Sequence, residues 1–396
     1  MGRTVSLYIP GFDIPKTTGV KYGDYAVFFD EAGNALVLDA GQRPASAVLR
    51  EWIKKQHFKR IWAVGTHPHT DHINGIKDII NDPDIRVEKV WMTDYAALGA
   101  YTKNKYRSKP WYSRVCSMYD GCAKGLYDLC QHNGIQVGWL QTGTQIRIGD
   151  IHCKVLWQSK NSYRGPDTDP LAGMFINNFS PVFLFDFGYF VAGDNELGCD
   201  AARNVCKPVI IAQIPHHGNY VDKKAFAKLK PKAAWYNYGE KGGTIGKDKG
   251  FTSWTVPVVQ ATGADIWNNF KDGSILMHFT DDMVVVCGDR SDRTKYYSLG
   301  EYKNWSRSDE ELAVEVMLRK HGNGDARKNA LGTRWANVQS YVMVFVNDRD
   351  ALLEAMADYI IRDLCGSGEK RRAFIGEEYY TDVQKVVTRK MRERNG

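Results

Sequence analysis

The sequence predicts an α/β fold in which two β-sheets pack face to face with helices outside, followed by a small helical region. Two patterns lead to this prediction. Over the first 300 residues, short apolar runs of β type alternate with segments of helical periodicity, as in layered α/β domains. About the last ninety residues instead repeat one helical pattern around a glycine-rich turn. A chain of 396 residues is long enough for one large domain and something smaller.

The first half of the large domain can be assigned element by element. Residues 24–41 (DYAVFFDEAGNALVLDAG) predict two strands around the turn EAGN, and residues 44–58 place apolar side chains at helical steps. A strand at 60–64 (RIWAV), a short helix at 73–80 (INGIKDII) and a strand at 89–93 (KVWMT) follow. This interleaving favours a sheet that is covered by helices.

The second half adds a helical segment and another run of strands. Residues 111–133 have a helical pattern, and residues 135–158 predict consecutive strands. Later strands are expected within 180–194, 208–220, 233–239 and 272–288. Because strands and helices are interleaved in two halves, two packed sheets with helices outside are favoured.

A cluster of metal-capable side chains directly follows the strand at 60–64. It contains His67, His69, Asp71 and His72. A strand alternates its side chains, so we expect the first three to point the same way and a turn to bring His72 round to them. A lone histidine is usually a surface or core residue, but four such groups are costly to pack together unless a cation neutralises and orients them. The cluster therefore predicts a metal site.

Two later strands end in further residues of the same kind. Asp194 ends the apolar run in YFVAGDNE, and His216 and His217 end the run in IIAQIPHHGNY. Residues just past the carboxyl ends of neighbouring strands gather along one edge of an α/β fold, where ligands usually bind. Asp194 alone could be a turn cap. Together with the histidines, it predicts that three strands deliver metal ligands to one place.

The motifs HPHTDH, NNFSPVFLF, GDNE and PHHGN resemble the metallo-β-lactamase superfamily, and the resemblance covers roughly residues 5 to 295. It implies an αββα sandwich with two Zn²⁺ ions on its edge, or Mn²⁺ or Fe²⁺ in their place. It also implies that His67 and His69 hold one metal, that Asp71 and His72 hold the other, and that Asp194 bridges the two.

The resemblance extends to residues around these ligands. Either His216 or His217 would complete the second metal site, and the sequence leaves open which ring does so. Asp39 in LVLDAG matches an aspartate that supports the metal loop, and Asn178 and Ser180 are further candidates for supporting the ligands.

One departure from the family pattern bears on function. Many members have another histidine before the bridging aspartate, where this chain has Asn177, Asn178 and Ser180. In this respect the chain is similar to the nuclease-like domain of bacterial DNA-uptake proteins and to phosphorylcholine esterases that act on teichoic acid. The resemblance makes β-lactam hydrolysis the least favoured activity. It implies attack by a metal-activated hydroxide, with Asp71, His216 and His217 as catalytic candidates.

The C-terminal repeat is visible as an offset of 44 positions between residues 312–332 and 356–376. It resembles the Cpl-seven-type cell-wall-binding repeat found at the ends of phage lysozymes and gut-bacterial hydrolases. We expect a hydrolase domain at 1–300 and repeats at 305–349 and 350–396. The alternative is a three-helix spacer or dimerisation unit. Candidate wall-binding residues are Gly322, Gly324, Arg327, Gly366, Gly368 and Arg371.

Charge and hydropathy limit the remaining choices. The net charge is +7, and the basic C-terminal segments would suit an anionic polymer or a solvated helix face. No apolar run approaches the roughly 20 residues of a membrane span, and the N-terminus lacks the pattern of a secretory signal. Synthesis in the cytoplasm and action at the wall after phage lysis or non-classical release would fit.

The combined prediction is a dinuclear-zinc phosphoesterase that acts on a cell-wall-associated substrate such as a teichoic acid phosphorylcholine ester. Peptidoglycan-binding repeats would hold it at that substrate, as in a phage lysin. One alternative is a metal-dependent nuclease or cyclic-nucleotide phosphodiesterase, whose partner would be nucleic acid. Another is a wall-binding structural protein with a vestigial metal site.

Overall fold

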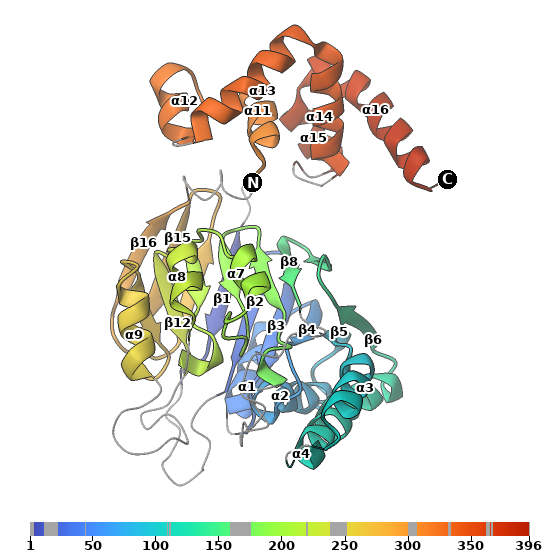
Figure 1. Ribbon diagram of the computed structural model, residues 1–396, viewed down its shortest axis with the longest axis vertical. Coiled ribbons are helices and arrows are strands. Elements are labelled where there is room, and N and C mark those ends of the chain that lie inside the picture. Colours follow the sequence, from blue (N-terminus) through green and yellow to red (C-terminus); the bar gives the residue numbers. More distant parts are fainter. Residues whose placement is uncertain are drawn as a thin grey trace. The chain divides into compact units, whose positions relative to one another are not determined.

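The computed structural model describes residues 4–11, 23–43, 45–108, 110, 112–158, 176–218, 221–237, 252–299, 307–331, 334–361, 365 and 367–395. The chain divides into two units, residues 1–299 and 300–396. Figure 1 shows the strands in the first unit and the helices α11 to α16 in the second.

The strands of the first unit form two sheets. Their bounds are β1 Val5–Ile9, β2 Tyr25–Asp30, β3 Asn34–Ala40, β4 Arg60–Gly65, β5 Val87–Thr93, β6 Gln136–Leu140, β7 Gln145–Ile148, β8 Ile151–Trp157, β9 Val182–Phe185, β10 Tyr189–Val191, β11 Ile211–Gln213, β12 Ala233–Tyr236, β13 Asp265–Asn268, β14 Ile275–Phe279, β15 Met283–Gly288 and β16 Thr294–Ser298. The first sheet has the order β16-β15-β14-β1-β2-β3-β4-β5-β6, and the second has the order β13-β12-β11-β10-β9-β8-β7.

The helices of the first unit are α1 Ala45–Gln56, α2 Thr70–Ile80, α3 Tyr95–Tyr106, α4 Tyr112–Ser117, the π-helical segment η1 Met118–Ala123, α5 Lys124–His132, α7 Asp200–Val205, the short η2 His216–Gly218, α8 Lys223–Leu229 and α9 Thr252–Gln260. Helices α1, α2 and α5 cover the outer face of the first sheet, where Leu49, Ile76 and Leu126 share one core with the strands.

The two sheets face each other through aromatic side chains. Phe28 of β2 in the first sheet stacks on Phe185 of β9 in the second, with ring centroids 4.2 Å apart, and contacts Tyr189 edge-on. Stacked and edge-to-face ring pairs contribute more than their buried area alone. The two-sheet α/β sandwich predicted from the sequence is confirmed by the strand order and by this contact.

The predicted helical segment after β5 is present and packs next to the later metal motif. Leu98 of α3, Val115 of α4 and Tyr119 of η1 form a small core with Ile176 and Phe179, two residues just before β9. Residues far apart in the sequence are thus fixed against each other. This packing holds the 176–180 turn in place.

The second unit contains two sets of three helices, as the offset predicts. The first set is α11 Asp309–Met317, α12 Gly324–Leu331 and α13 Trp335–Asn347, and the second is α14 Arg349–Ile361, α15 Gly368–Ile375 and α16 Glu377–Asn395. Both sets contribute to one apolar core, which includes Leu312, Val338, Met356 and Val383. Helix α11 begins with a capping box between Ser308 and Glu311.

A half-buried polar cluster links the two helix sets. The carboxylate of Glu315 in α11 accepts hydrogen bonds from Arg307, His321 and Tyr359 of α14. Glu315 and Tyr359 are 44 positions apart, so they occupy equivalent places in the two copies. Burial alone would raise the pKa of Glu315, but the hydrogen bond from His321 and the charge of Arg307 hold it below its ordinary 4.5.

Glu315→Gln is expected to destabilise the second unit by about 1.5 kcal/mol at neutral pH, because it removes a charge that holds three donors. A carboxylate whose folded pKa is lowered stabilises the protein above its unfolded pKa and loses that contribution as the pH falls through the folded pKa. Urea unfolding from pH 7 down to about 3 should therefore show the two proteins converging. A difference that persists at the lowest pH would contradict this prediction.

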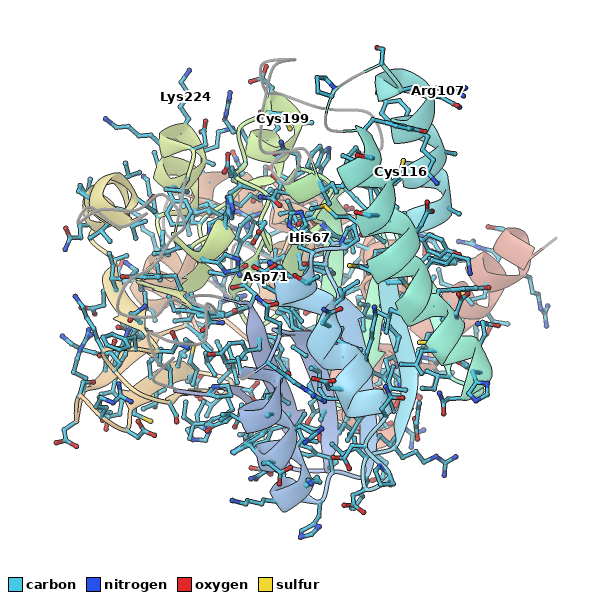
Figure 2. The ribbon with its side chains drawn as sticks, turned by 90° about the horizontal axis from the view of Figure 1, so that it is seen from below. His67, Asp71, Arg107, Cys116, Cys199 and Lys224 are labelled. Atoms are coloured by element: carbon cyan, nitrogen blue, oxygen red, sulfur yellow. The ribbon has the colours of Figure 1, made fainter. Side chains whose placement is uncertain are left out.

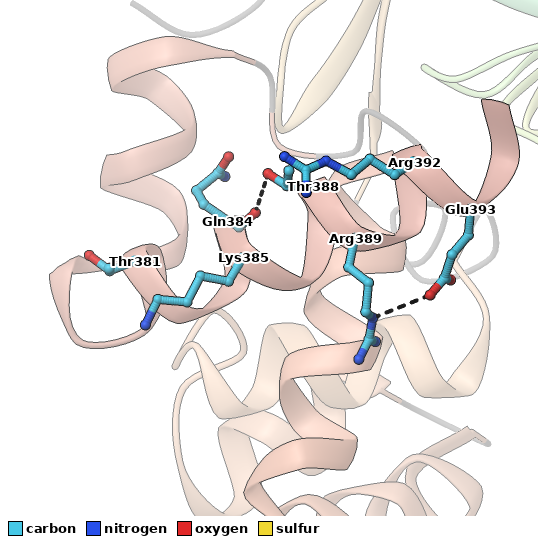
Figure 3. A pocket seen from close by; sticks show the side chains of 7 residues that line it. All are labelled: Thr381, Gln384, Lys385, Thr388, Arg389, Arg392 and Glu393. Atoms are coloured by element: carbon cyan, nitrogen blue, oxygen red, sulfur yellow. Dashed lines mark hydrogen bonds and ion pairs between the residues drawn. The ribbon is translucent and has the colours of Figure 1, made fainter. Parts of the chain in front are cut away.

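Helix α16 carries a shallow groove of about 530 Å³, lined by Thr381, Gln384, Lys385, Thr388, Arg389, Arg392 and Glu393 (Figure 3). Several basic side chains here have acidic partners. Lys385 pairs with Asp382, and Arg389 with Glu354. This pairing favours a solvated helix face over a polyanion-binding stripe. Among the residues described, the helices are all too short or too polar to cross a membrane.

Candidate metal centre

The first metal motif lies between a strand and a helix. β4 ends at Gly65 and α2 begins at Thr70, so His67 and His69 occupy the connection, while Asp71 and His72 lie in the first helical turn. The expected strand alternation is therefore wrong for Asp71, which a helical turn brings round. Figure 2 labels His67, which lies in this connection, and Asp71, which lies in the first turn of the helix.

The first group of potential ligands is formed by His67, His69 and Asp194. Nε2 of His67 lies 2.9 Å from Nδ1 of His69 and 3.6 Å from Oδ2 of Asp194. Thr66 donates its hydroxyl hydrogen to Asp39, so its oxygen can accept from Nδ1 of His67 at 3.1 Å. The Nε2 of His67 is then left with a lone pair that points at the group.

The second group of potential ligands is formed by Asp24, His72, Asp194 and His217, so it shares Asp194 with the first. Oδ1 of Asp194 is 3.2 Å from Nε2 of His72 and 3.6 Å from Nε2 of His217. The same nitrogen of His217 lies 3.3 Å from Oδ2 of Asp71. The two oxygens of Asp194 thus face different groups. This is the placement that a bridging carboxylate requires.

The two adjacent histidines are divided between the groups. Both adopt left-handed backbone conformations, with φ of 52° for His216 and 53° for His217. His217 faces Asp71 and the second group, whereas Nε2 of His216 lies 3.8 Å from Oδ2 of Asp194, on the side of the first group. His217 therefore lies with the second group, and His216 lies beside the first.

A carboxylate holds the Nδ1 atom of three of these rings. The pairs are His72 with Asp39 at 2.8 Å, His216 with Glu196 at 2.9 Å and His217 with Asp24 at 3.1 Å. An ionised carboxylate only accepts hydrogen bonds, so each Nδ1 carries a hydrogen and each ring presents Nε2 to the centre. This is the usual way in which proteins orient metal-binding histidines.

The charges in the cluster suit a cation. Burial lowers the pKa of His67 well below 6.5 and that of His69 to about 4, so both rings are neutral at pH 7. Burial acts in the same direction on His217, but Asp194 and then Asp24 raise its pKa to about 10. The buried carboxylates thus draw positive charge toward themselves, which a divalent metal would supply.

Some buried polar atoms of the cluster make no hydrogen bond, which bears on whether a metal ion fits there. Within the described ranges, Nε2 of His69, Nε2 of His72 and Oδ1 of Asp194 are buried and make no hydrogen bond. Leaving such atoms unpaired costs free energy, and metal binding would explain Nε2 of His72 and Oδ1 of Asp194, which lie 3.2 Å apart in the second group. The residues present therefore fit a metal site.

Asp24 is a site residue that sequence reasoning missed. It is buried just before β2, and it binds the side chain of Gln213 as well as that of His217. Gln213 accepts hydrogen bonds from the backbone of Ala192 and Gly193, and the Asp24 N–H donates to the carbonyl of Asp71. Asp24 therefore joins the three ligand-bearing loops. Its only sequence signal is an aspartate at the start of an apolar strand.

The other supporting residues predicted from the sequence lie close to the ligands. Asp39 holds both Thr66 and His72, and Ser180 accepts a hydrogen bond from the Asp194 N–H at 3.3 Å. The backbone carbonyl of Asn178 accepts from Asn195 at 3.2 Å. Asn178 thus supports the Asp194 turn through its main chain.

Asp24→Asn is expected to weaken metal binding by about 10- to 100-fold. His217 and Gln213 donate to the two different oxygens of Asp24. Asparagine keeps one acceptor oxygen and replaces the other with a donor nitrogen, so one of the two contacts must fail. Metal content after dialysis against a graded chelator would measure the change. Asp30→Asn is the matched control, because Asp30 is a buried carboxylate that serves the β2–β3 hairpin. Equal metal affinity in wild type and Asp24→Asn would contradict this role.

Of the predicted wall-binding residues that the structure describes, Gly322 precedes α12, Gly324 and Gly368 begin α12 and α15, and the two arginines lie inside these helices. Gly322, Gly324 and Gly368 all have positive φ, which favours glycine. Arg327 donates from Nε to the carbonyl of Gly322 and from Nη2 to Asn323, so it closes its own turn. Arg371 lies at the equivalent place in α15. Gly366 lies outside the described residues.

Comparisons with known proteins found a family match in the second unit and solved structures of low similarity to the chain. The model of the CW_7 repeat matches residues 310–344. The metallo-beta-lactamase fold protein YhfI from Bacillus subtilis is similar at a TM-score of 0.43 and 8% identity, over 70% of this chain and 99% of that chain. The B3 metallo-beta-lactamase BLEG-1 is similar at a TM-score of 0.27 and 14% identity, over 56% of this chain and 83% of that chain. The metallo-beta-lactamase from Pontibacter korlensis is similar at a TM-score of 0.28 and 16% identity, over 57% of this chain and 79% of that chain. No curated protein matches the chain.

The strand order and the buried cluster characterise the first unit, and the repeat match characterises the second. The chain combines a two-sheet α/β sandwich, which contains a buried His/Asp cluster of metal-site type, with a helical unit in which residues 310–344 match the CW_7 repeat.

Proposed function

We propose that this protein is a two-metal hydrolase that cleaves phosphoesters on bacterial cell-wall polymers, with teichoic acid or phosphorylcholine-type esters as the substrate class. The observation that carries the proposal is the position of Asp194, whose two oxygens face two separate groups of histidine and aspartate ligands. A site of this shape suits a pair of divalent cations, with Zn²⁺ preferred by the histidine-rich ligand set.

We divide the ligands between two cations according to the two groups described above. His67, His69 and Asp194 would hold the first cation. His72, His217 and Asp194 would hold the second together with Asp71, whose Oδ2 lies 3.3 Å from Nε2 of His217. When bound, such a pair supplies a hydroxide nucleophile near neutral pH and neutralises charge that builds on phosphoryl oxygens.

The chain's own residues set up this chemistry. Asp24 and Asp39 fix the rings of His217 and His72, so these ligands are already oriented before a substrate arrives. The side chain of His216 is 15% exposed, whereas that of His72 is fully buried. The ring of His216 is therefore more open to a substrate than that of His72, and its Nε2 lone pair could accept a hydrogen bond from the substrate.

The second unit supports the cell-wall part of the proposal. A binding module that holds an enzyme against a polymer raises the local substrate concentration without changing the catalytic site. The CW_7 repeat at 310–344 would supply that attachment, with peptidoglycan as the partner.

Hydrolysis of bis(p-nitrophenyl) phosphate and p-nitrophenyl phosphorylcholine by the zinc-loaded protein tests the proposal. We expect turnover of at least one substrate, loss of that turnover in His69→Ala, and no covalent enzyme intermediate. Linear DNA, a cyclic nucleotide and a muropeptide complete the panel. Activity on DNA alone would replace the wall hydrolase with a nuclease, and two bound metals without any hydrolysis would remove the enzyme proposal.

Residues 305–396 expressed alone are expected to fold as helices and to co-sediment with purified peptidoglycan, because this unit has its own core. Binding to sacculi from several Gram-positive sources and circular dichroism would measure the two properties. The fragment 1–299 serves as the comparison and should remain in the supernatant. A folded C-terminal unit that binds none of the sacculi would favour the spacer role.

A further inference from the structure

The side chain of Asn177 is buried beside the first group of potential ligands. It belongs to neither of the two groups. It is 3% exposed and lies between Ile176 and Phe179, which pack against Leu98 and Tyr119 of the helical insertion. The backbone carbonyl of Asn177 also accepts a hydrogen bond from the Ser180 N–H at 2.9 Å. Both its backbone and its neighbours are therefore fixed, so its amide has one defined position.

The amide of Asn177 points at His216. Its Nδ2 lies 3.2 Å from Nε2 of His216, while its Oδ1 is buried and makes no hydrogen bond within the described part of the chain. Glu196 accepts the hydrogen on Nδ1 of His216, so Nε2 of this ring has the lone pair and Asn177 donates to it. That lone pair is the one with which His216 would bind a metal.

The two neighbouring histidines thus differ in how their Nε2 atoms are used. His217 directs Nε2 toward Asp71 and Asp194, within the second group. His216 has Nε2 3.8 Å from Asp194, but its lone pair accepts a hydrogen bond from Asn177. One lone pair serves one partner, so His216 can join the first group only when it gives up the amide.

We propose that Asn177 withholds His216 from the first metal group and thereby makes the two metal sites unequal. This inference rests on the two-metal site of the proposed function. The second site has its four protein ligands in place and binds its cation first. The first site binds more weakly, because His216 becomes its fourth ligand only after the hydrogen bond from Asn177 is broken.

Stepwise titration of the metal-free full-length protein with Zn²⁺ against a competing chelator tests this proposal, with Co²⁺ absorption as an independent readout. In the wild type we expect one cation to bind about tenfold more tightly than the other, which corresponds to about 1.4 kcal/mol. Asn177→Leu should tighten the weaker site about tenfold and leave the stronger site unchanged. Asn177→Ser is the alternative if the leucine variant does not fold.

A double-mutant cycle identifies the route of the effect. His216→Ala should weaken only the weaker site, and adding Asn177→Leu to it should then change nothing. Asn34→Ala is the control, because Asn34 is a buried asparagine of the β2–β3 hairpin that contacts Asp30. Two cations of equal affinity in the wild type, or an unchanged ratio in both Asn177 variants, would overturn the role of Asn177 alone. Binding of fewer than two cations would overturn the two-metal proposal and this inference with it.

Discussion

Asp194→Ala is expected to remove bound metal from both groups and to lower phosphodiester hydrolysis by on the order of 10³ or more. The reason is geometric. Asp194 is buried, and each of its oxygens lies within 3.6 Å of a histidine nitrogen in a different group. Alanine removes both oxygens, which leaves each group one ligand short and leaves His72 and His217 without their shared negative partner.

Elemental analysis after dialysis, together with hydrolysis rates, would measure both effects. Asp186→Ala is the matched control, because Asp186 lies between β9 and β10 and pairs with His152. We expect this variant to keep its metal and its activity. Full metal occupancy in Asp194→Ala would show that the bridging role is misassigned. Loss of one metal only would restrict Asp194 to the group that it empties.

The fold and most residues of the His/Asp cluster could be predicted from the sequence because the signals are local. Four ligand-type residues lie within positions 67–72, and Asp194 and the 216–217 pair each follow an apolar run. The carboxyl ends of such strands meet at one edge, so the convergence could be expected before any coordinates. The position of a short motif that directly follows a strand can therefore be predicted from the sequence.

The remaining parts of the site depend on contacts between distant segments. Asp24 is 193 positions from His217, and no local pattern links the two. The division of His216 and His217 between the groups depends on two successive left-handed residues and on which carboxylate each ring meets. The repeat offset likewise predicted six helices but gave no sign that the equivalent residues Glu315 and Tyr359 would touch.

Helix propensity and tertiary packing predict opposite effects of Gly75→Ala on stability. Gly75 lies inside α2, where an alanine is ordinarily favoured over glycine by about 1 kcal/mol. In the structure, however, a Cβ at this position would lie 2.0 Å from the carbonyl oxygen of Ala40 and 2.6 Å from its carbonyl carbon. Both are backbone atoms at the end of β3, so no side chain can move aside. The helix itself would have to shift.

We therefore expect Gly75→Ala to destabilise the first unit by about 3 kcal/mol, and the unfolding midpoint to fall by about 8 °C. Metal affinity should fall as well, because α2 begins with Asp71 and His72, and Ala40 directly follows Asp39, which holds His72. Gly121→Ala is the control, since a Cβ there meets no atom within 4 Å. Thermal unfolding and metal titration of the two variants would measure these effects. A Gly75→Ala protein as stable as wild type would mean that α2 does not pack on β3 as closely as its hydrogen bond from Gly75 to Gly41 implies.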